Sequence, residues 1–288
     1  MQPFAYACPN TLADALALLA ERGPGARVLA GGTDLIIRLR DGSASPALVV
    51  DIKRVPELAP GIRNEAGTIV IGATTTMTEI AASPIVRRHA HALGEAAAAV
   101  GSIQIRNRAT LGGNICNASP AADTAPPLLV HDARVVAAGP TGVRRIAVDD
   151  LFVRSGITTL APGELVVAVE VPMPASRIAS AHQRRTRRRG HDLASVTLAC
   201  GVDAAGVTRV AFGSVGPRPL VRVDTSGVLA DPGAPDAARA DVLATILADA
   251  SPSATSMRAG PEYRLAMLRV LGRRALAIAL ERLAAGEQ

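Results

Sequence analysis

Two pairs of adjacent glycines, each among small polar residues, are the clearest candidates for chemistry in this 288-residue sequence. The first pair lies in LAGGTDL at residues 29–35, and the second lies in NRATLGGNICNASPAADTAPPL at residues 107–128. Glycine accepts a positive φ, and successive peptide N–H groups exposed at such a turn bind a phosphate-sized anion. The two segments therefore predict two anion-binding loops, each able to hold one half of a pyrophosphate. Neither segment pairs a nucleophile with a base.

Side chains within the two segments extend this interpretation. Thr33, Thr110 and Asn114 add hydrogen-bond donors. Asp34 and Asp123 are acids near a predicted anion, so we expect them to cap helices or to accept hydrogen bonds from hydroxyls. The alternative for each glycine pair is a plain tight turn, and neither pair fits the G-x-G-x-x-G dinucleotide fingerprint.

The elements that must position the first pair form a small α/β unit, residues 1–57. A helix capped by Thr11 and ended by Gly23 precedes a buried strand that runs into the glycines. A second helix, with Thr33 and Asp34 as possible caps, stops at Gly42 and leads to another strand. The pattern predicts the order helix–strand–helix–strand.

The second pair lies in a longer α+β unit, residues 58–174. Apolar strands are predicted at 68–75, 133–139 and 164–172, and one helix is predicted at 83–101, opened by a serine cap and a proline. A linker at 172–180 leads to a third unit, residues 178–286.

The third unit begins with two strands, 192–203 and 207–216, which are joined by a turn at Gly206. Apolar residues recur at helical spacing in the region that follows Ala234. The fold class predicted for the whole chain is therefore α+β.

Composition excludes several classes of protein. The chain has no Trp, two Tyr and three Phe, so its core must come from Leu, Val, Ile and Ala. The sequence contains no run of about 20 apolar residues, so no membrane span is expected. The N-terminus has no secretory signal. Three scattered cysteines fit a reducing cytoplasm and are too few to hold an iron–sulfur cluster, which needs four ligands. We expect Cys116 to be a small buried thiol and expect no metal site, because His89 and His91 would point apart on a helix.

The run RRTRRR at residues 184–189 is the strongest sign of a different function. Such a run can bind the phosphates of a nucleic acid, or it can form a solvated face of the surface. Because no aromatic residue is interleaved to stack on bases, the surface interpretation is favoured and no nucleic acid is expected.

The motifs taken together resemble one known family. AGGTDL, IGATTT and QIRNRATLGGNICNASPAADTAP occur in the order typical of the FAD-binding medium subunits of molybdenum hydroxylases, the carbon monoxide dehydrogenase, xanthine dehydrogenase and aromatic-heterocycle dehydrogenase family. The resemblance continues through LFVRSGITTLAPGELVVAVEVP and YRLAMLRVLGRRAL, and so covers nearly the whole chain. It implies a two-subdomain FAD-binding fold of the vanillyl-alcohol-oxidase (PCMH) type, followed by a C-terminal α+β domain with a small antiparallel sheet and helices.

The resemblance also implies which residues line the cofactor. FAD would be bound noncovalently, with the glycine segments at its pyrophosphate, Leu165 beside the flavin ring, and Arg184 or Arg185 near the flavin. The cofactor-binding residues implied are Ala30, Gly31, Gly32, Thr33, Asp34, Leu35, Thr75, Thr110, Gly112, Gly113, Asn114, Ser119, Asp123, Leu165 and Arg184.

Three positions depart from the family pattern. Ala109 stands where the family often has glycine, and Met77 replaces a histidine that follows the IGATTT strand. His182 and Arg184 stand where the family usually has tyrosine and lysine, which puts the ring contacts at those positions in doubt.

The function implied is that of an oxidoreductase subunit with no catalytic residue of its own. FAD would accept electrons from [2Fe–2S] clusters of a small partner chain, downstream of a large molybdopterin-binding chain, and pass them to NAD, a quinone or oxygen. A cytoplasmic dimer of heterotrimers is expected. The alternative is a self-contained FAD-dependent oxidoreductase of the same fold, which would need its own base near the flavin and often has a covalent histidine link.

Overall fold

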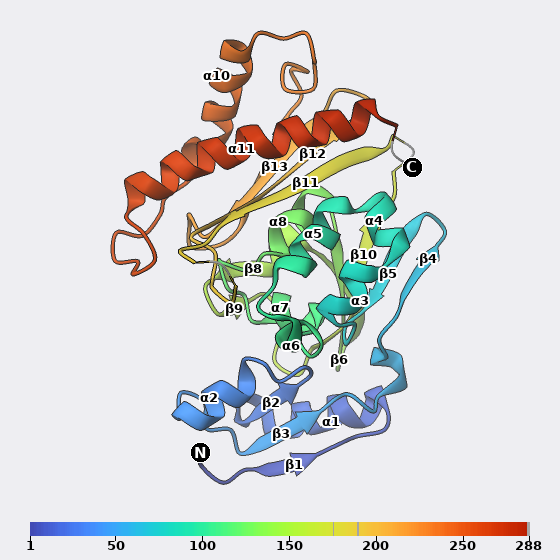
Figure 1. The fold of residues 1–288 in the computed structure, drawn as a ribbon. Coiled ribbons are helices and arrows are strands. Elements are labelled where there is room, and N and C mark those ends of the chain that lie inside the picture. Colours follow the sequence, from blue (N-terminus) through green and yellow to red (C-terminus); the bar gives the residue numbers. More distant parts are fainter. Residues whose placement is uncertain (175, 189, 287–288) are drawn as a thin grey trace.

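The structure is a computed structural model that describes residues 1–174, 176–188 and 190–286. In this described part the strands form three larger sheets and a two-stranded ribbon, and the sheets follow one another along the molecule in chain order (Figure 1). None of the described helices is long and apolar enough to cross a membrane.

The bounds of the elements are as follows. The strands are β1 (Ala5–Ala7), β2 (Ala26–Leu29), β3 (Leu48–Asp51), β4 (Ile62–Glu65), β5 (Thr68–Gly72), β6 (Arg134–Gly139), β7 (Gly142–Ala147), β8 (Phe152–Arg154), β9 (Ile157–Thr158), β10 (Leu165–Pro172), β11 (Ile178–Arg185), β12 (Val196–Asp203), β13 (Thr208–Gly213) and β14 (Leu220–Asp224). The helices are α1 (Leu12–Arg22), α2 (Leu35–Asp41), α3 (Met77–Ala82), α4 (Pro84–His89), α5 (His91–Ala99), α6 (Ile103–Arg106), α7 (Leu111–Cys116), α8 (Ala125–Val130), α9 (Val148–Leu151), α10 (Asp236–Ile246) and α11 (Pro261–Ala284). Short 3₁₀ turns occupy Gly23–Gly25, Pro56–Leu58 and Leu247–Asp249.

The N-terminal sheet is small and parallel, with strand order β1-β3-β2 and α1 packed against β2 and β3. The predicted caps of α1 are confirmed, since the Thr11 hydroxyl accepts from the Asp14 amide and Gly23 ends the helix at φ +49°. The predicted order lacked β1, a three-residue edge strand whose Tyr6 is exposed and which therefore shows no apolar alternation.

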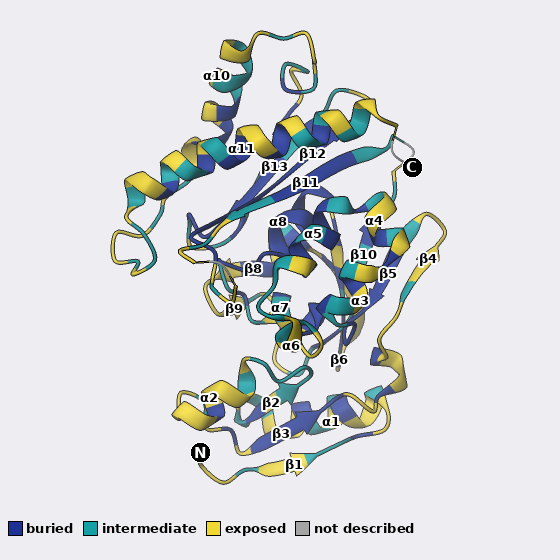
Figure 2. Cartoon of the chain, viewed as in Figure 1, coloured by how far each residue is buried: buried dark blue, intermediate teal, exposed yellow. Residues whose placement is uncertain are grey.

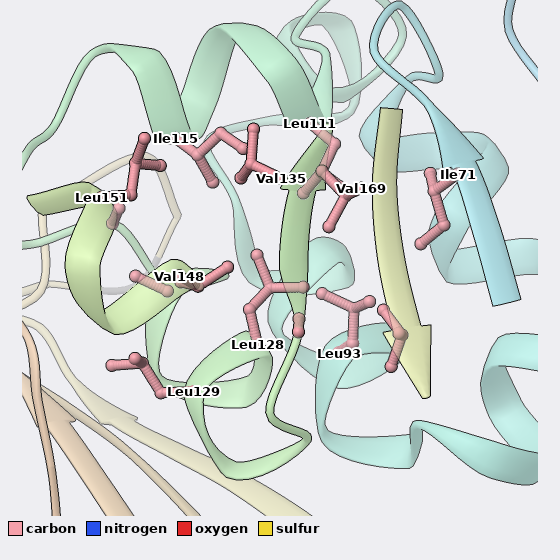
Figure 3. Packing of buried hydrophobic residues seen from close by; sticks show 14 of the residues in the cluster. Ile71, Leu93, Leu111, Ile115, Leu128, Leu129, Val135, Val148, Leu151 and Val169 are labelled. Atoms are coloured by element: carbon pink, nitrogen blue, oxygen red, sulfur yellow. The ribbon is translucent and has the colours of Figure 1, made fainter. Parts of the chain in front are cut away.

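The central sheet is antiparallel, with strand order β4-β5-β10-β6-β7. Helices cover one of its faces, and Figure 3 shows Leu111 and Ile115 of α7 packed with Leu128 and Val135 in this core. As composition predicted, the core is aliphatic and rich in alanine.

The helix predicted at 83–101 is in fact two helices, α4 and α5. Ala90 separates them with φ −138° and ψ 53°, and its amide bonds the Val86 carbonyl to end α4. Helical spacing alone could not show this break, because Ala90 is itself buried. Both helices contact α3, but only α4 reaches β4 and only α5 packs against β11 among their main contacts.

The C-terminal sheet is antiparallel, with strand order β11-β12-β13-β14, and both of its faces are covered. The long helix α11 lies on one face, and α5 and α8 lie on the other (Figure 1). Strands β12 and β13 are therefore buried along nearly their whole length (Figure 2). The linker predicted at 172–180 is shorter than expected, because Ile178 already begins β11; Ala175 lies outside the described residues.

Buried polar contacts join this C-terminal sheet to the central helices. The Ser180 hydroxyl accepts from the Ala92 amide at 3.1 Å and contacts the His131 Nε2 atom at 3.0 Å. Glu95 accepts from the His182 amide at 2.8 Å and also pairs with Arg282 of α11. Burial lowers the pKa of His131 to about 4, with a smaller contribution from Arg209, so this imidazole is neutral at pH 7.

We expect His131→Gln to reduce the acid sensitivity of the fold. The folded-state pKa of His131 is depressed, so its stabilising contribution is complete above the unfolded pKa near 6.5 and is lost as pH falls toward 4. The loss is on the order of 2–3 kcal/mol, and glutamine does not titrate but can still bond Ser180.

Urea unfolding of both proteins at pH 7 and pH 4.5 measures this difference. The exposed His191 provides the control, because His191→Gln should retain the wild-type pH dependence. If the free energy of unfolding falls equally between pH 7 and pH 4.5 in wild type and His131→Gln, His131 is not the group responsible for the acid sensitivity.

Candidate functional site

A cleft of about 330 Å³ lies where the N-terminal sheet meets the central sheet. This volume lies within the range typical of small-ligand pockets, about 300–1,000 Å³. One wall comes from the β2–α2 region, and the other comes from α7 and the start of β10. The lining residues are Arg27, Val28, Ala30, Gly31, Gly32, Thr33, Asp34, Leu35, Arg38, Ala44, Ile52, Ala73, Ala109, Thr110, Gly112, Gly113, Asn114, Cys116, Asn117, Leu160, Glu164, Leu165 and Val166.

The first glycine segment forms a loop whose amides are available to a ligand. Gly32 has φ +76°, as the sequence predicted. In the described chain the amides of residues 31–35 donate to no protein acceptor, while the Gly32 carbonyl accepts from Ile36 at 3.0 Å. Asp34 precedes α2 without a side-chain capping bond, so the expected capping role is wrong and its carboxylate remains free to accept from a ligand hydroxyl.

Gly31 is required for a different reason, which is close backbone approach. A Cβ atom placed on Gly31 would lie 2.0 Å from the carbonyl oxygen of Arg108, the residue that precedes Ala109 and Thr110 on the opposite wall. Because no side chain fits between these backbones, the two glycine segments can meet at the base of the cleft.

The second glycine pair is not an anion-binding nest, which corrects the sequence prediction. It lies in α7, and Gly112 and Gly113 are not among the glycines with positive φ. The amides of Leu111 and Gly112 bond the carbonyls of Thr75 and Ala73, each at 3.0 Å, and the Gly113 amide bonds the Thr110 hydroxyl at 3.1 Å. The amide of Asn114 bonds the Thr110 carbonyl.

Gly112 instead allows α7 to pack closely against Ala73, which follows the end of β5. A Cβ atom on Gly112 would lie 2.7 Å from the Ala73 carbonyl oxygen. The second segment therefore contributes shape and the side chains of Thr110 and Asn114, rather than free peptide donors.

Three charged side chains among the described residues of the cleft, Arg27, Arg38 and Glu164, are held by hydrogen bonds. Arg27 donates to the carbonyls of Pro24 and Ala26, and Arg38 donates to the Asn117 side chain. Glu164 is bound by Arg144 through two hydrogen bonds, so its charge is neutralised by a partner on its own wall. The hydrogen bonds from Arg144 lower the pKa of this carboxyl, which keeps it ionised.

Eleven of the fifteen residues predicted from the sequence line the cleft: Ala30, Gly31, Gly32, Thr33, Asp34, Leu35, Thr110, Gly112, Gly113, Asn114 and Leu165. Thr75, Ser119, Asp123 and Arg184 do not. Thr75 is fully buried, and its hydroxyl bonds both the amide and the carbonyl of Gly61. Ser119 accepts from the Ala121 amide within its own turn.

Asp123 and Arg184 meet in a separate buried cluster with His182 and Thr197. Arg184 donates to Asp123 at 2.8 Å, and His182 Nε2 lies 2.9 Å from the Thr197 hydroxyl. Burial raises the pKa of Asp123 to about 6 against the opposing effect of Arg184, and the second carboxylate oxygen, Oδ1, has no hydrogen-bond partner. This cluster couples the segment that follows α7 to the C-terminal sheet.

The arginine run is only partly a solvated face. Arg184 is half-buried and pairs with Asp123, Arg185 donates to the Tyr263 hydroxyl, and Arg187 pairs with Asp192. Arg189 lies outside the described residues. Cys116, expected to be buried, is exposed and lines the cleft.

Sequence reasoning missed several lining residues, among them Arg27, Arg38, Asn117, Leu160 and Glu164. Arg38 could have been found, since it follows Asp34 and Leu35 by four and three residues and so shares their face of a helix. Leu160 and Glu164 lie just before β10, where Gly163 has φ +83°, but they are distant in sequence from both glycine pairs, and the fold brings them to the cleft.

The cleft fits a ligand that carries a diphosphate and an apolar body. The Gly31–Leu35 amides suit the anion, as do Arg27 and Arg38, which form no ion pair with a carboxylate of the described residues. Val28, Ile52 and Val166 supply apolar contact. No described group of three or more His, Cys, Asp or Glu residues is arranged to hold a metal ion.

Comparisons with known proteins agree with this chemistry. Residues 2–174 match the family model described as the FAD binding domain in molybdopterin dehydrogenase, and residues 181–279 match the CO dehydrogenase flavoprotein C-terminal domain. The chain is 34% identical over 276 residues to a putative xanthine dehydrogenase FAD-binding subunit of Escherichia coli, with 94% of each chain covered. It is 34% identical over 286 residues to the carbon monoxide dehydrogenase medium chain of Hydrogenophaga pseudoflava, with 98% of each covered.

A chain of the solved structure of reconstituted CO dehydrogenase from Oligotropha carboxidovorans is similar over the whole fold. The TM-score is 0.90 at 31% identity, and the match covers 98% of this chain and 99% of that one.

We expect Gly31→Ala to impair both stability and flavin retention. The added methyl group would meet the Arg108 carbonyl at 2.0 Å and push the two walls apart, at a cost of about 1–3 kcal/mol. The matched control is Gly25→Ala, where the nearest atom to the new methyl is 3.8 Å away. Denaturant unfolding and the FAD-to-protein ratio of the purified variants measure the two effects; a Gly31→Ala protein equal to the control in both would refute the close-approach argument.

Proposed function

Because the chain belongs to the family of FAD-binding subunits of molybdopterin dehydrogenases, we propose that it is an electron-relay subunit. Its FAD would accept electrons from [2Fe–2S] clusters of a small partner chain and pass them to NAD, a quinone or oxygen. The observation that carries the proposal is the cleft between the two glycine segments, which offers binding groups without catalytic ones.

The residues of this chain bind and orient the cofactor. The Gly31–Leu35 amides suit the diphosphate, Thr33 and Asn114 can bond hydroxyls or phosphate oxygens, and Leu165 supplies an apolar surface. FAD itself supplies a redox centre that can exchange electrons singly or in pairs. The protein contributes position and electrostatic environment.

The alternative, a self-contained flavin oxidoreductase, is less well supported. None of the described lining residues is a histidine, so the cleft offers no site for a histidine–flavin bond. Glu164 is engaged by Arg144, and Asp34 lies in the anion-binding loop rather than beside Leu165 on the opposite wall. No described side chain of the cleft is thus placed as an acid–base pair for substrate oxidation.

The partners follow from the same proposal. Relatives are named as subunits or as a medium chain, which supports assembly with a large molybdopterin-binding chain and a small [2Fe–2S] chain. We propose a cytoplasmic dimer of such heterotrimers. Within this chain, residues 1–57 and 58–174 would form the two FAD-binding subdomains and residues 178–286 the C-terminal domain.

The isolated chain should not oxidise an aromatic heterocycle, an aldehyde or carbon monoxide, whereas a complex with both partner chains should. Substrate should bleach the flavin and iron–sulfur absorbance of the complete complex, because electrons reach the flavin through the clusters. A complex that lacks only the iron–sulfur chain should keep its flavin oxidised. Substrate turnover by the lone chain at a rate similar to that of the complex would establish the self-contained enzyme instead.

A further inference from the structure

Arg38 projects into the cleft from α2 and spans it to the opposite wall. Its guanidinium donates to the Asn117 side chain, which belongs to the C-terminal end of α7 and is 79 residues away in sequence. Both residues line the cleft. The guanidinium is therefore held at the cleft by a contact that requires the two walls to be together.

Asp41, on the same helix, is attracted electrostatically to Arg38 but forms no ion pair with it. No described carboxylate lies within 4.0 Å of its guanidinium, in contrast to Arg144 on the other side of the cleft, which is paired with Glu164. A guanidinium has five N–H donors in a planar fork, and Asn117 occupies only part of them. The remaining donors match the oxygens of a phosphate group.

The Gly31–Leu35 amides and the Arg38 guanidinium offer an anion two separate binding positions. Arg38 follows Asp34 by one helical turn, so about 6 Å of helix rise lies between the loop and the arginine. Both lie on the cleft-facing side of this segment. One phosphate group at the loop leaves the guanidinium free for the neighbouring group of a diphosphate.

We propose that Arg38, oriented by Asn117, is a phosphate-binding residue that recognises the diphosphate of the dinucleotide in this cleft. The inference rests on the proposed role of the cleft in FAD binding and adds a charged donor that the glycine motifs do not contain.

Titration of the flavin-free full-length chain with FAD, followed by flavin fluorescence, tests the inference. Arg38→Gln keeps an amide donor for Asn117 and removes the charge, so its Kd for FAD should rise by about tenfold to a hundredfold. The difference in Kd between Arg38→Gln and wild type should become smaller at high salt, because screening weakens the attraction between Arg38 and the phosphate in the wild-type protein. Arg38→Lys keeps the charge and should bind FAD more tightly than Arg38→Gln.

Arg40→Gln is the matched control, since Arg40 is exposed on the same helix and does not line the cleft. Its Kd should equal that of wild type. The inference fails if Arg38→Gln binds FAD like wild type, or if the Lys and Gln variants lose affinity equally with no dependence on salt, which would leave the contact with Asn117 as a purely structural bridge. A wild-type chain that binds no FAD would refute the proposed function itself.

Discussion

The functional cleft depends on one contact between two backbones, that of Gly31 with the carbonyl of Arg108. Every side chain larger than hydrogen is excluded there, since a Cβ would lie 2.0 Å from the carbonyl oxygen. The contact brings a loop with free amides to a wall anchored in the central core. Without it, the loop and the opposite wall would not enclose a common cleft.

The two walls contribute differently because their peptide groups are used differently. The Gly31–Leu35 loop keeps its amides unbonded within the protein, whereas the amides at the start of α7 are used to attach that helix to the Ala73–Thr75 segment. Leu111 and Ile115 of α7 are buried in the central core, and their packing fixes the position of this helix (Figure 3). One wall thus provides free peptide donors, and the other provides a rigid surface with the side chains of Thr110 and Asn114.

Much of this architecture could be predicted from sequence where local chemistry decides the outcome. Thr11, Gly23 and Gly42 end or begin helices where expected, because capping depends on residues close in the chain. The family motifs predicted the α+β fold and FAD binding. The break at Ala90 and the edge strand β1 were missed, because each depends on packing or pairing with distant segments.

The site shows the same limit. Most motif residues do line the cleft, but the motif could not reveal that the Gly112–Gly113 amides are already bonded, nor that Asp123 and Arg184 meet in a cluster of their own. Neither glycine pair contains Arg38 or Glu164; helical spacing from Asp34 could have indicated Arg38, whereas tertiary structure brings Glu164 to the cleft.

The position of the cleft between two sheets has a thermodynamic consequence. A ligand that touches both walls adds its binding free energy only to the state in which the walls are together. FAD bound in the cleft as proposed would therefore couple the unfolding of the N-terminal sheet to that of the central core. In calorimetry we expect the flavin-free chain to unfold over two separable transitions and the flavin-bound chain to unfold as one cooperative unit.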